Sequence, residues 1–314
     1  MLFRVINDKD FSSIANIQRL TDYDGSEYSL LYLKGWDFFN YPSMEIAQEN
    51  GVIYLRFKPH DKFNDEGVGD GRIYLPPLCS LDKIKDAYAN IANQCKTDGE
   101  NMYVMSTPKQ YVDILGDDYE YADTADYAEY LYDPQSLMTY AGKKLHSKRN
   151  HVNNFIKAYT PNQEGGCVFR SYAAQDKDKV FAFINGWEES KEFDDEEYDD
   201  MANNEEYVIA LALEMVEKYD NYFADVIEYQ GKIIGFSLGE ITPSNVGITH
   251  IEKGDIEYDG VYSYLCQAFA QKHYGGVRVV NRQEDMGLEG LRKSKQSYRP
   301  IGFCRKFAVK KACK

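Results

Sequence analysis

Short apolar runs alternate with longer amphipathic stretches along the whole chain. In the first half, the run 52–57 (VIYLRF) has the length and the β-branched content of a strand, and Ser80 to Cys95 carries apolar residues at helical spacing. A tyrosine-rich run at 128–133 is predicted to be a further strand, which Asp133-Pro134 closes. Helix and strand signals mix throughout this half, so we expect one mixed domain over residues 1–141.

The second half shows the alternation more clearly. Residues 142–166 are predicted to form a basic linking helix and a linker, because apolar residues recur on one helical face before the breaker TPNQEGG. The elements expected after it are a strand at 167–172, an amphipathic segment at 176–187, an acidic solvated loop at 188–200, a helix at 205–219, a hairpin at 223–241, a strand at 246–253, a helix at 262–274, a strand at 277–281, a short helix at 287–298 and a final strand at 303–310.

The order from the hairpin onward is typical of an acetyltransferase-type (GNAT) domain. The first half has a looser version of the same order, which favours a tandem duplication. A length of 314 residues also fits about two domains. The predicted fold class is therefore α+β, with two tandem GNAT-like (acyl-CoA N-acyltransferase) domains at 1–141 and 167–314, each a mixed sheet flanked by helices. The second domain is expected to hold the site.

The composition describes an ordinary globular chain with an acidic surface. Hydrophobic residues make up 43% and charged residues 28%, and the formal net charge is -15. Such a charge repels nucleic acid and anionic membranes unless positive residues gather locally, and we expect no DNA partner. No apolar run reaches the roughly 20 residues that cross a bilayer, and the start MLFRVINDKDF lacks a secretion segment. We expect a cytoplasmic protein without stable membrane insertion.

The cysteines and histidines give no metal-binding pattern. Among six cysteines no pair has C-x-x-C spacing, and among five histidines no pair has His-x-x-x-His spacing. We expect free thiols and no metal.

Positive charge is concentrated in the predicted linking helix. Between residues 143 and 157 there is no acidic residue, and the basic residues are Lys143, Lys144, Lys148, Arg149 and Lys157. Such a patch can neutralise the phosphates of RNA or of a nucleotide, although it can equally be a solvated face balanced by the acidic stretch. Arg149 lies on the apolar stripe itself, so it needs a partner, either a structural carboxylate or the phosphate or carboxylate of a ligand.

Lys295 poses the same question in the short helix near the end of the chain. Leu288, Leu291, Lys295 and Tyr298 follow helical spacing, which places the ammonium among apolar neighbours. Either the head reaches water, or it lines a pocket and stabilises the oxyanion formed when an ester or thioester carbonyl is attacked.

Polar residues directly follow the buried strand at 277–281, the usual place for a site in a mixed sheet. Asn281, Glu284 and Asp285 could bind an amine or begin the next helix, and Arg282 and Arg292 are candidates for binding substrate or phosphate. Asp285 is either a helix cap or a base.

On the strand 246–253, alternation places His250 and Glu252 on one face and Lys253 on the other. His250 is either a general base or a half-buried histidine with satisfied hydrogen bonds. The turn that follows reads KGDIEYDGVYSY, where an acetyl-CoA enzyme normally has a glycine-rich turn whose amides hold the pyrophosphate. Asp255, Glu257 and Asp259 would repel that group, so acetyl-CoA is the less expected donor. The chain also lacks a P-loop and a G-x-S-x-G elbow.

Two long motifs carry a family resemblance. GKKLHSKRNHVNNF at 142–155 and NRQEDMGLEGLRKSKQSYRP at 281–300, with IGFSLGE and HIEKGD between them, resemble bacterial proteins related to the C-terminal domain of phosphatidylglycerol lysyltransferase. The resemblance implies two tandem GNAT-like domains, as in the Fem peptidyltransferases, which use aminoacyl-tRNA as donor.

The resemblance also implies a role for Lys295. In the lysyltransferases a lysine of the last helix, within a pattern like F-K-x-K-F, is tied to activity, and Lys295 before Tyr298 matches it approximately, with Ser294 and Ser297 replacing two pattern residues. The lysyltransferases carry a membrane-spanning flippase before this domain and this sequence has none, so we do not expect a lipid acceptor.

Three functions are compatible with these residues. The leading hypothesis is transfer of an aminoacyl group from tRNA to an amine or hydroxyl acceptor, with Lys143, Lys144, Lys148 and Arg149 holding phosphate and Lys295 stabilising the oxyanion, without any other cofactor. The alternatives are a CoA-dependent N-acyltransferase acting on a small amine, and a non-catalytic protein that binds a small molecule or a peptide.

Overall fold

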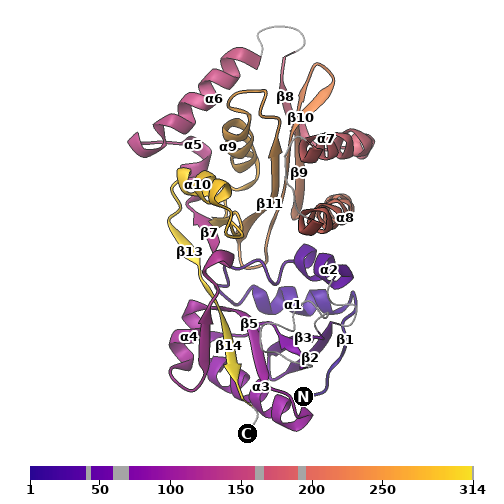
Figure 1. Ribbon diagram of the computed structural model, residues 1–314, viewed down its shortest axis with the longest axis vertical. Helices are drawn as coiled ribbons and strands as arrows, with labels where there is room; N and C mark the ends of the chain where they lie inside the picture. Colours follow the sequence, from indigo (N-terminus) through magenta and orange to yellow (C-terminus); the bar gives the residue numbers. More distant parts are fainter. Residues whose placement is uncertain (40–43, 59–70, 160–165, 190–195, 313–314) are drawn as a thin grey trace. The chain divides into compact units, whose positions relative to one another are not determined.

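The chain forms two compact units. The computed structural model describes all residues except 40–43, 59–70, 160–165, 190–195 and 313–314. The first unit comprises Met1–Glu129, Glu284–Gly287 and Phe303–Lys314, and the second comprises Tyr130–Gln283 and Leu288–Gly302 (Figure 1). Both chain ends therefore belong to the first unit.

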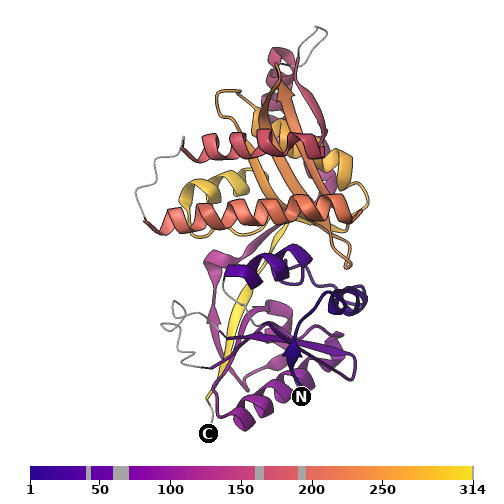
Figure 2. The ribbon, with the colours of Figure 1, turned by 90° about the vertical axis from the view of Figure 1, so that its right-hand side faces the viewer.

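The first unit is built on a seven-stranded sheet. Its strand order is β1 (Arg4–Val5), β2 (Glu45–Glu49), β3 (Val52–Phe57), β4 (Ile73–Tyr74), β5 (Met102–Pro108), β14 (Lys306–Lys311) and β6 (Glu120–Asp123). Its helices are α1 (Asp10–Gln18), α2 (Leu30–Phe39), α3 (Ile84–Asp98) and α4 (Lys109–Leu115). Figures 1 and 2 show α1 and α2 on one side of this sheet and α3 on the other. All six residues of β3 are buried, as expected for a strand covered on both faces.

The second unit has a sheet of the same size. Its strand order is β13 (Gly302–Cys304), β7 (Glu129–Tyr132), β12 (Val279–Asn281), β11 (Val246–Gly254), β10 (Lys232–Ile241), β9 (Tyr222–Tyr229) and β8 (Val168–Ser171). Its helices are α5 (Pro134–Thr139), α6 (His146–Tyr159), α7 (Lys177–Glu189), α8 (Glu196–Lys218), α9 (Val261–His273) and α10 (Glu289–Ser297). In Figure 2, α7 and α8 run across one face of the sheet, and Figure 1 shows α6 and α9 on the other.

The two sheets have the same plan. In each, an antiparallel run is followed by one parallel pair, β4 with β5 in the first unit and β11 with β12 in the second. The next strand in each sheet comes from the other half of the chain, since β14 lies between β5 and β6, and β7 lies between β12 and β13. The expected tandem GNAT-like fold is thus present, with one strand exchanged between its halves.

An ion pair of the same kind occurs at the equivalent place in each unit. Arg4 binds Asp10 through two hydrogen bonds of 2.8 and 2.6 Å, and Arg170 binds Asp176 in the same way at 2.6 and 2.9 Å. Both pairs have a spacing of six residues and join an edge strand to the start of the next helical segment. Each aspartate also accepts a backbone N–H from three residues earlier, Asn7 or Ala173. This shared arrangement is a trace of duplication that the sequence analysis missed.

The structure divides the chain differently from the predicted boundaries. Residues 130–166 were expected in the first domain and in a linker, but their described part belongs to the second unit, and 303–314 belongs to the first. The boundary prediction assumed that each sheet uses one continuous segment, and the strand exchange breaks that assumption.

Two element predictions are wrong. The predicted final strand at 303–310 is two strands in different sheets, because Arg305 separates β13 from β14. In the acidic stretch predicted as a loop, residues 196–200 begin α8 and residues 190–195 lie outside the described part. Within the described ranges, no helix is long and apolar enough to cross a membrane.

Candidate active site

The parallel pair of the second sheet opens at one end. Pairing between β11 and β12 runs from Val246 with Val279 to Ile248 with Asn281, and β11 then continues to Gly254 beyond the last paired residue. Side chains from both strands, from α6 and from α10 gather at this opening. The carboxyl end of a parallel strand in a mixed sheet is a common place for a ligand site.

His250 occupies a bulge at the start of the opening. The register with β10 passes from Leu238–Ile251 to Gly239–Thr249, so His250 is the extra residue. Its Nε2 lies 2.9 Å from Glu240 Oε1, and its Nδ1 lies 3.3 Å from Gln283 Nε2. Both ring nitrogens have partners and the side chain is only 6% exposed. This is the satisfied histidine that the sequence analysis offered as the alternative to a base.

Arg282 and Glu252 form a buried ion pair in the opening. The Arg282 Nη2 to Glu252 Oε1 distance is 2.7 Å, and the side chains are 11% and 9% exposed. The guanidinium carbon lies 4.5 Å from the ring centre of Tyr298 and 5.6 Å from that of Tyr132. Among the residues that the structure describes, Arg282 Nη1 has no hydrogen-bond partner although it is buried. A buried guanidinium N–H without an acceptor is a donor available to a ligand.

Glu252 is a single carboxylate among three cations. Burial raises its pKa, while the positive charges of Arg282, Lys148 and Lys295 oppose that rise. Ionised Glu252 balances only one of those charges. The cluster formed by Glu252, Arg282, Lys148 and Lys295, called the cation cluster below, therefore has surplus positive charge suited to an anion.

Lys148 points inward rather than into solvent. Its Nζ lies 3.7 Å from the ring centre of Tyr298. Burial, and then the positive charge of Arg282, lower the pKa of Lys148 to about 8. Because of this, the Lys148 amine is mostly protonated at neutral pH and becomes largely neutral in mildly alkaline solution.

Lys295 holds the end of β12. Its Nζ donates to the backbone carbonyls of Arg282 and Gln283, the latter at 3.2 Å. The Tyr132 hydroxyl in turn donates to the Lys295 carbonyl at 2.7 Å. The predicted apolar surroundings are only partly present, because Leu288 is 47% exposed while Tyr298 is buried. The observed contacts make Lys295 a support for Arg282.

The basic residues of the linking helix separate into different roles. Lys143 and Lys144 form an exposed 3-10 turn before α6. Arg149 Nη1 donates to the carbonyls of Tyr140, at 2.5 Å, and Gly142, at 3.2 Å. The partner of Arg149 is thus backbone at the end of α5, neither of the partners that the apolar stripe predicted.

The other predicted residues shape turns or lie nearby. Asn281 is fully buried and its Oδ1 accepts the Gln283 N–H at 2.7 Å. Asp285 does not cap α10, whose N-cap is Leu288, and instead its Oδ1 accepts the Gly287 N–H at 3.0 Å. Glu284 and Asp285 belong to the first unit. Arg292 lies on α10 and is partly buried.

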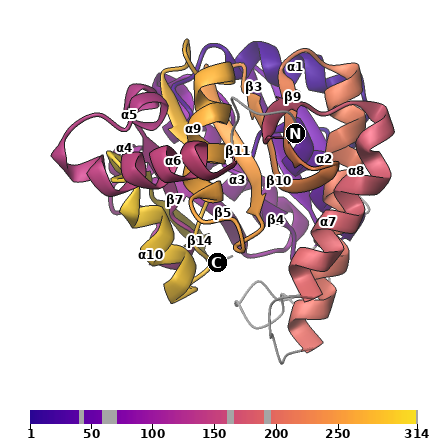
Figure 3. The same ribbon diagram turned by 90° about the horizontal axis from the view of Figure 1, so that it is seen from above.

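The turn between β11 and α9 is covered by α6. Gly260, the N-cap of α9, has φ of +87°, and a Cβ built there would lie 2.4 Å from the carbonyl oxygen of His151 and 3.1 Å from Phe155 Cβ. Figure 3 shows α6 running beside α9. The turn also carries the exposed carboxylates Glu257 and Asp259. A pyrophosphate would meet both negative charge and a packed helix here, so these residues do not fit CoA.

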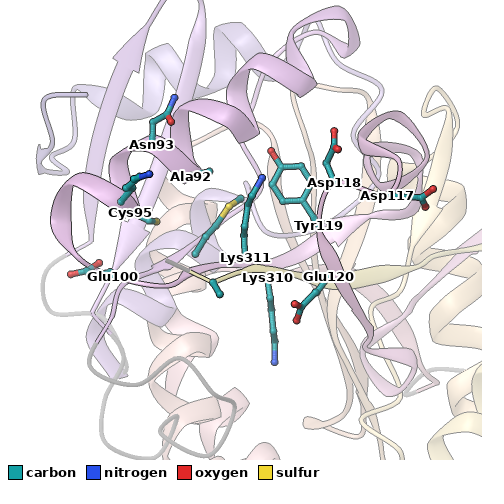
Figure 4. A pocket seen from close by; sticks show the side chains of 13 residues that line it. Ala92, Asn93, Cys95, Glu100, Asp117, Asp118, Tyr119, Glu120, Lys310 and Lys311 are labelled. Carbon is teal, nitrogen blue, oxygen red and sulfur yellow. The ribbon is translucent and has the colours of Figure 1, made fainter. Parts of the chain in front are cut away.

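A separate depression of about 540 Å³ lies in the first unit, over α3, β14 and the segment before β6. Figure 4 shows Lys310 and Lys311 there together with Asp117, Asp118 and Glu120. It contains none of the residues predicted from the sequence. Its mixed charges do not converge on one group, so we place the candidate site in the second unit.

The sequence analysis missed the tyrosines and the importance of Glu252. Tyr132 and Tyr298 face Arg282, and Tyr130 lies 5.9 Å from Lys295 Nζ. Alternation had placed Glu252 on one face with His250, and a carboxylate on a buried strand already signals a required cation. The chain has 27 tyrosines, and only the fold shows which of them lie near Arg282 and Lys295.

Repeated mixed sheets, a bulged strand and a parted parallel pair define a tandem GNAT-like fold of the acyltransferase type. The chain belongs to the family described as phosphatidylglycerol lysyltransferase, C-terminal, whose model matches residues 19–310. The fold is also similar to that of FemX, with a TM-score of 0.60 at 8% identity over 98% of this chain and 97% of that one.

Similar proteins cover nearly the whole chain. An uncharacterised protein of Mycoplasmoides gallisepticum is 24% identical over 321 residues, 97% of this chain and 99% of the relative. A conserved protein of unknown function from Bacteroides thetaiotaomicron has a TM-score of 0.82 at 22% identity, with 99% of each chain covered. L-PGS from Bacillus licheniformis has a TM-score of 0.64 at 13% identity, over 98% of this chain and 92% of that one. These structures share the fold.

Proposed function

We propose that the protein transfers an aminoacyl group from a charged tRNA to an amine or hydroxyl acceptor, at the opening between β11 and β12. The observation that carries this proposal is the cation cluster, which offers a buried Arg282 N–H and surplus positive charge where the strands part. An ester carbonyl under attack develops negative charge, and buried fixed donors stabilise it strongly.

The donor follows from two features of the second unit. The β11–α9 turn is acidic and packed under α6, which disfavours CoA. Lys143 and Lys144 are exposed at the start of α6, the helix that also carries Lys148, so they can contact the phosphates of a donor whose ester reaches the cluster. The ester of a charged tRNA is already activated, and positioning plus charge stabilisation can supply most of the rate.

Binding is tested by fluorescence anisotropy with bulk charged tRNA over a salt series. The native protein should bind more weakly as salt rises, and the double variant Lys143→Ala/Lys144→Ala should lower the log–log salt slope by roughly one to two units. The matched control is Lys85→Ala/Lys96→Ala, which removes the same charge from exposed positions of α3. Absence of binding at low salt, or equal losses in both double variants, would overturn tRNA as donor.

Transfer is tested with the same tRNA, charged with radiolabelled amino acids, and with hydroxylamine as a small acceptor. Arg282→Met should lower enzyme-dependent hydroxamate formation by roughly 10²- to 10³-fold, the loss typical of removing an oxyanion donor. Unchanged transfer in Arg282→Met would remove that residue from the site. Tight acetyl-CoA binding by calorimetry would instead favour the CoA-dependent alternative.

A further inference from the structure

Lys148 differs from the other ionisable groups of the opening. His250 uses both ring nitrogens, Glu252 is paired with Arg282, and Lys295 donates to two backbone carbonyls. Within the described part of the chain, the Lys148 amine donates to no hydrogen-bond acceptor, and its close contact is the face of the Tyr298 ring. Its nitrogen lone pair is therefore not committed to another group when the amine is neutral.

The surroundings of Lys148 come from four elements. Arg282 at the end of β12 contributes positive charge, Glu252 on β11 contributes negative charge, and Cys266 on α9 and Tyr298 at the end of α10 are buried neutral groups. Burial together with Arg282 disfavours the ammonium more strongly than Glu252 favours it, and the resulting pKa of about 8 suits a group that takes and returns a proton near neutral pH.

We propose that Lys148 is the general base of the acyl transfer, accepting the proton that the acceptor loses as it attacks. This inference rests on the proposed function and assigns Lys148 a role other than the phosphate binding expected from its place in a basic helix. Neighbouring Arg282 then has two effects, since it offers an N–H to the oxyanion and, together with burial, lowers the pKa of Lys148.

The step balances without any further reactant. The acceptor nitrogen or oxygen forms a bond to the ester carbonyl carbon, and its proton passes to Lys148 Nζ. The carbonyl oxygen carries the negative charge of the tetrahedral intermediate. As the intermediate collapses, the carbon–oxygen bond to the tRNA ribose breaks, and the Lys148 ammonium returns the proton to the leaving ribose oxygen.

The test compares Lys148→Arg with native protein in the hydroxylamine assay over a pH series. Arginine stays protonated at every pH of the series and cannot act as a base, so kcat/KM should fall roughly 10²- to 10⁴-fold. In the native protein kcat/KM should rise through about pH 8, and the variant should lose this limb. Lys157→Arg, an exposed change on the same helix, should alter neither. A Lys148→Arg protein that retains both the rate and the limb would refute the base role.

A second measurement does not depend on turnover. Competitive acetylation of the native protein, read by mass spectrometry, follows the titration of Lys148 directly, and half-maximal reactivity should fall near pH 8. Titration at the value of a free lysine would overturn the proposal, whether or not transfer is detected. If Lys148 titrates near pH 8 but no charged tRNA supports transfer, the proposed function fails, and the base role in that transfer fails with it, although the lowered pKa of Lys148 is established. The thermal unfolding of the Lys148→Met variant shows whether the fold tolerates replacement of this lysine.

Discussion

Each unit buries a small cluster of charged side chains. Cations outnumber carboxylates in the cluster of the second unit, and carboxylates outnumber cations in that of the first. In the second unit one carboxylate, Glu252, lies among three cations. In the first unit one cation, Lys306, lies between two fully buried carboxylates, at 2.5 Å from Glu27 Oε1 and 2.9 Å from Glu129 Oε1. Burial alone would lower the pKa of Lys306, but Glu129 and Glu27 raise it. A buried charge of this kind is tolerated because its partners surround it.

Replacing Lys306 should destabilise the first unit strongly. Lys306→Met leaves two carboxylates buried without their cation, and we expect the free energy of unfolding to fall by about 3 to 5 kcal/mol. Chemical denaturation monitored by circular dichroism measures this loss. Lys311→Met, an exposed change at the end of the same strand, should shift it by less than about 0.5 kcal/mol. Similar effects of both changes would show that the buried ion pairs contribute little.

At the residue scale, the sequence indicates which residues are candidates for the site but not which way their side chains point. It marked Lys148, Arg282 and Lys295 as members of a site, and all three reach the cation cluster. It could not tell that Lys148 turns inward while Lys143 stays in solvent, because helical spacing does not say which neighbour covers each face. For Arg149 it considered only charged partners, although backbone carbonyls at a helix end also satisfy a guanidinium.

Among the elements, α6 has the closest contact with the candidate site. It carries Lys148 toward the cation cluster and packs on the backbone of Gly260. The sequence showed Gly260 as part of a degenerate CoA turn. In the structure this position requires glycine for another reason. Its φ is positive, and the His151 carbonyl leaves no room for a Cβ. The glycine is thus explained by packing between α6 and α9.

Gly260→Ala should loosen this packing. The strained φ and the clash with His151 should cost about 1 to 3 kcal/mol of stability. Gly186→Ala is the matched control, because Gly186 lies inside α7 with open space around its Cα, and alanine there should stabilise by about 0.5 to 1 kcal/mol. Thermal unfolding of the two variants compares them. A neutral Gly260→Ala would mean that α6 shifts easily, which would also reopen the question of a CoA donor.

Long, regular elements were predicted well and short ones poorly. The strand at 52–57 has the predicted bounds, and the helix predicted from Ser80 to Cys95 corresponds to a 3-10 turn at Leu81–Lys83 followed by α3. The edge strands β1 and β6 and the helix α5 were missed, because two to six residues are too few for a hydrophobic period to show.

At the scale of the whole molecule, the strand exchange decides which segments of the chain each unit needs to complete its sheet. β14 pairs with β5 along Lys306–Lys311 and with β6 on its other side, and its residues Ala308 and Val309 are buried. A pairing partner some 200 residues away cannot be read from local periodicity, so the single strand predicted at 303–310 was placed in the second domain.

A chain ending at Arg305 should fail to complete the first unit. It lacks β14, so β5 and β6 lose their common neighbour and the Glu27 and Glu129 carboxylates lose Lys306. Hydrogen exchange should show loss of protection in β5 and β6, while a chain ending at Lys311, which keeps all of β14, should behave as the full chain does. Normal protection in the shorter chain would show that the first sheet is stable without its exchanged strand.

Strand exchange also sets the order in which a ribosome can finish the two units. Residues 1–129 leave the exit tunnel before β14 does, so their sheet lacks the strand between β5 and β6 until residues 306–311 are made. During that wait the nascent chain presents the facing edges of β5 and β6 unpaired, and open strand edges are sites of mispairing. The first unit, although most of its residues are made earlier, is therefore completed only after all the strands of the second unit have been made.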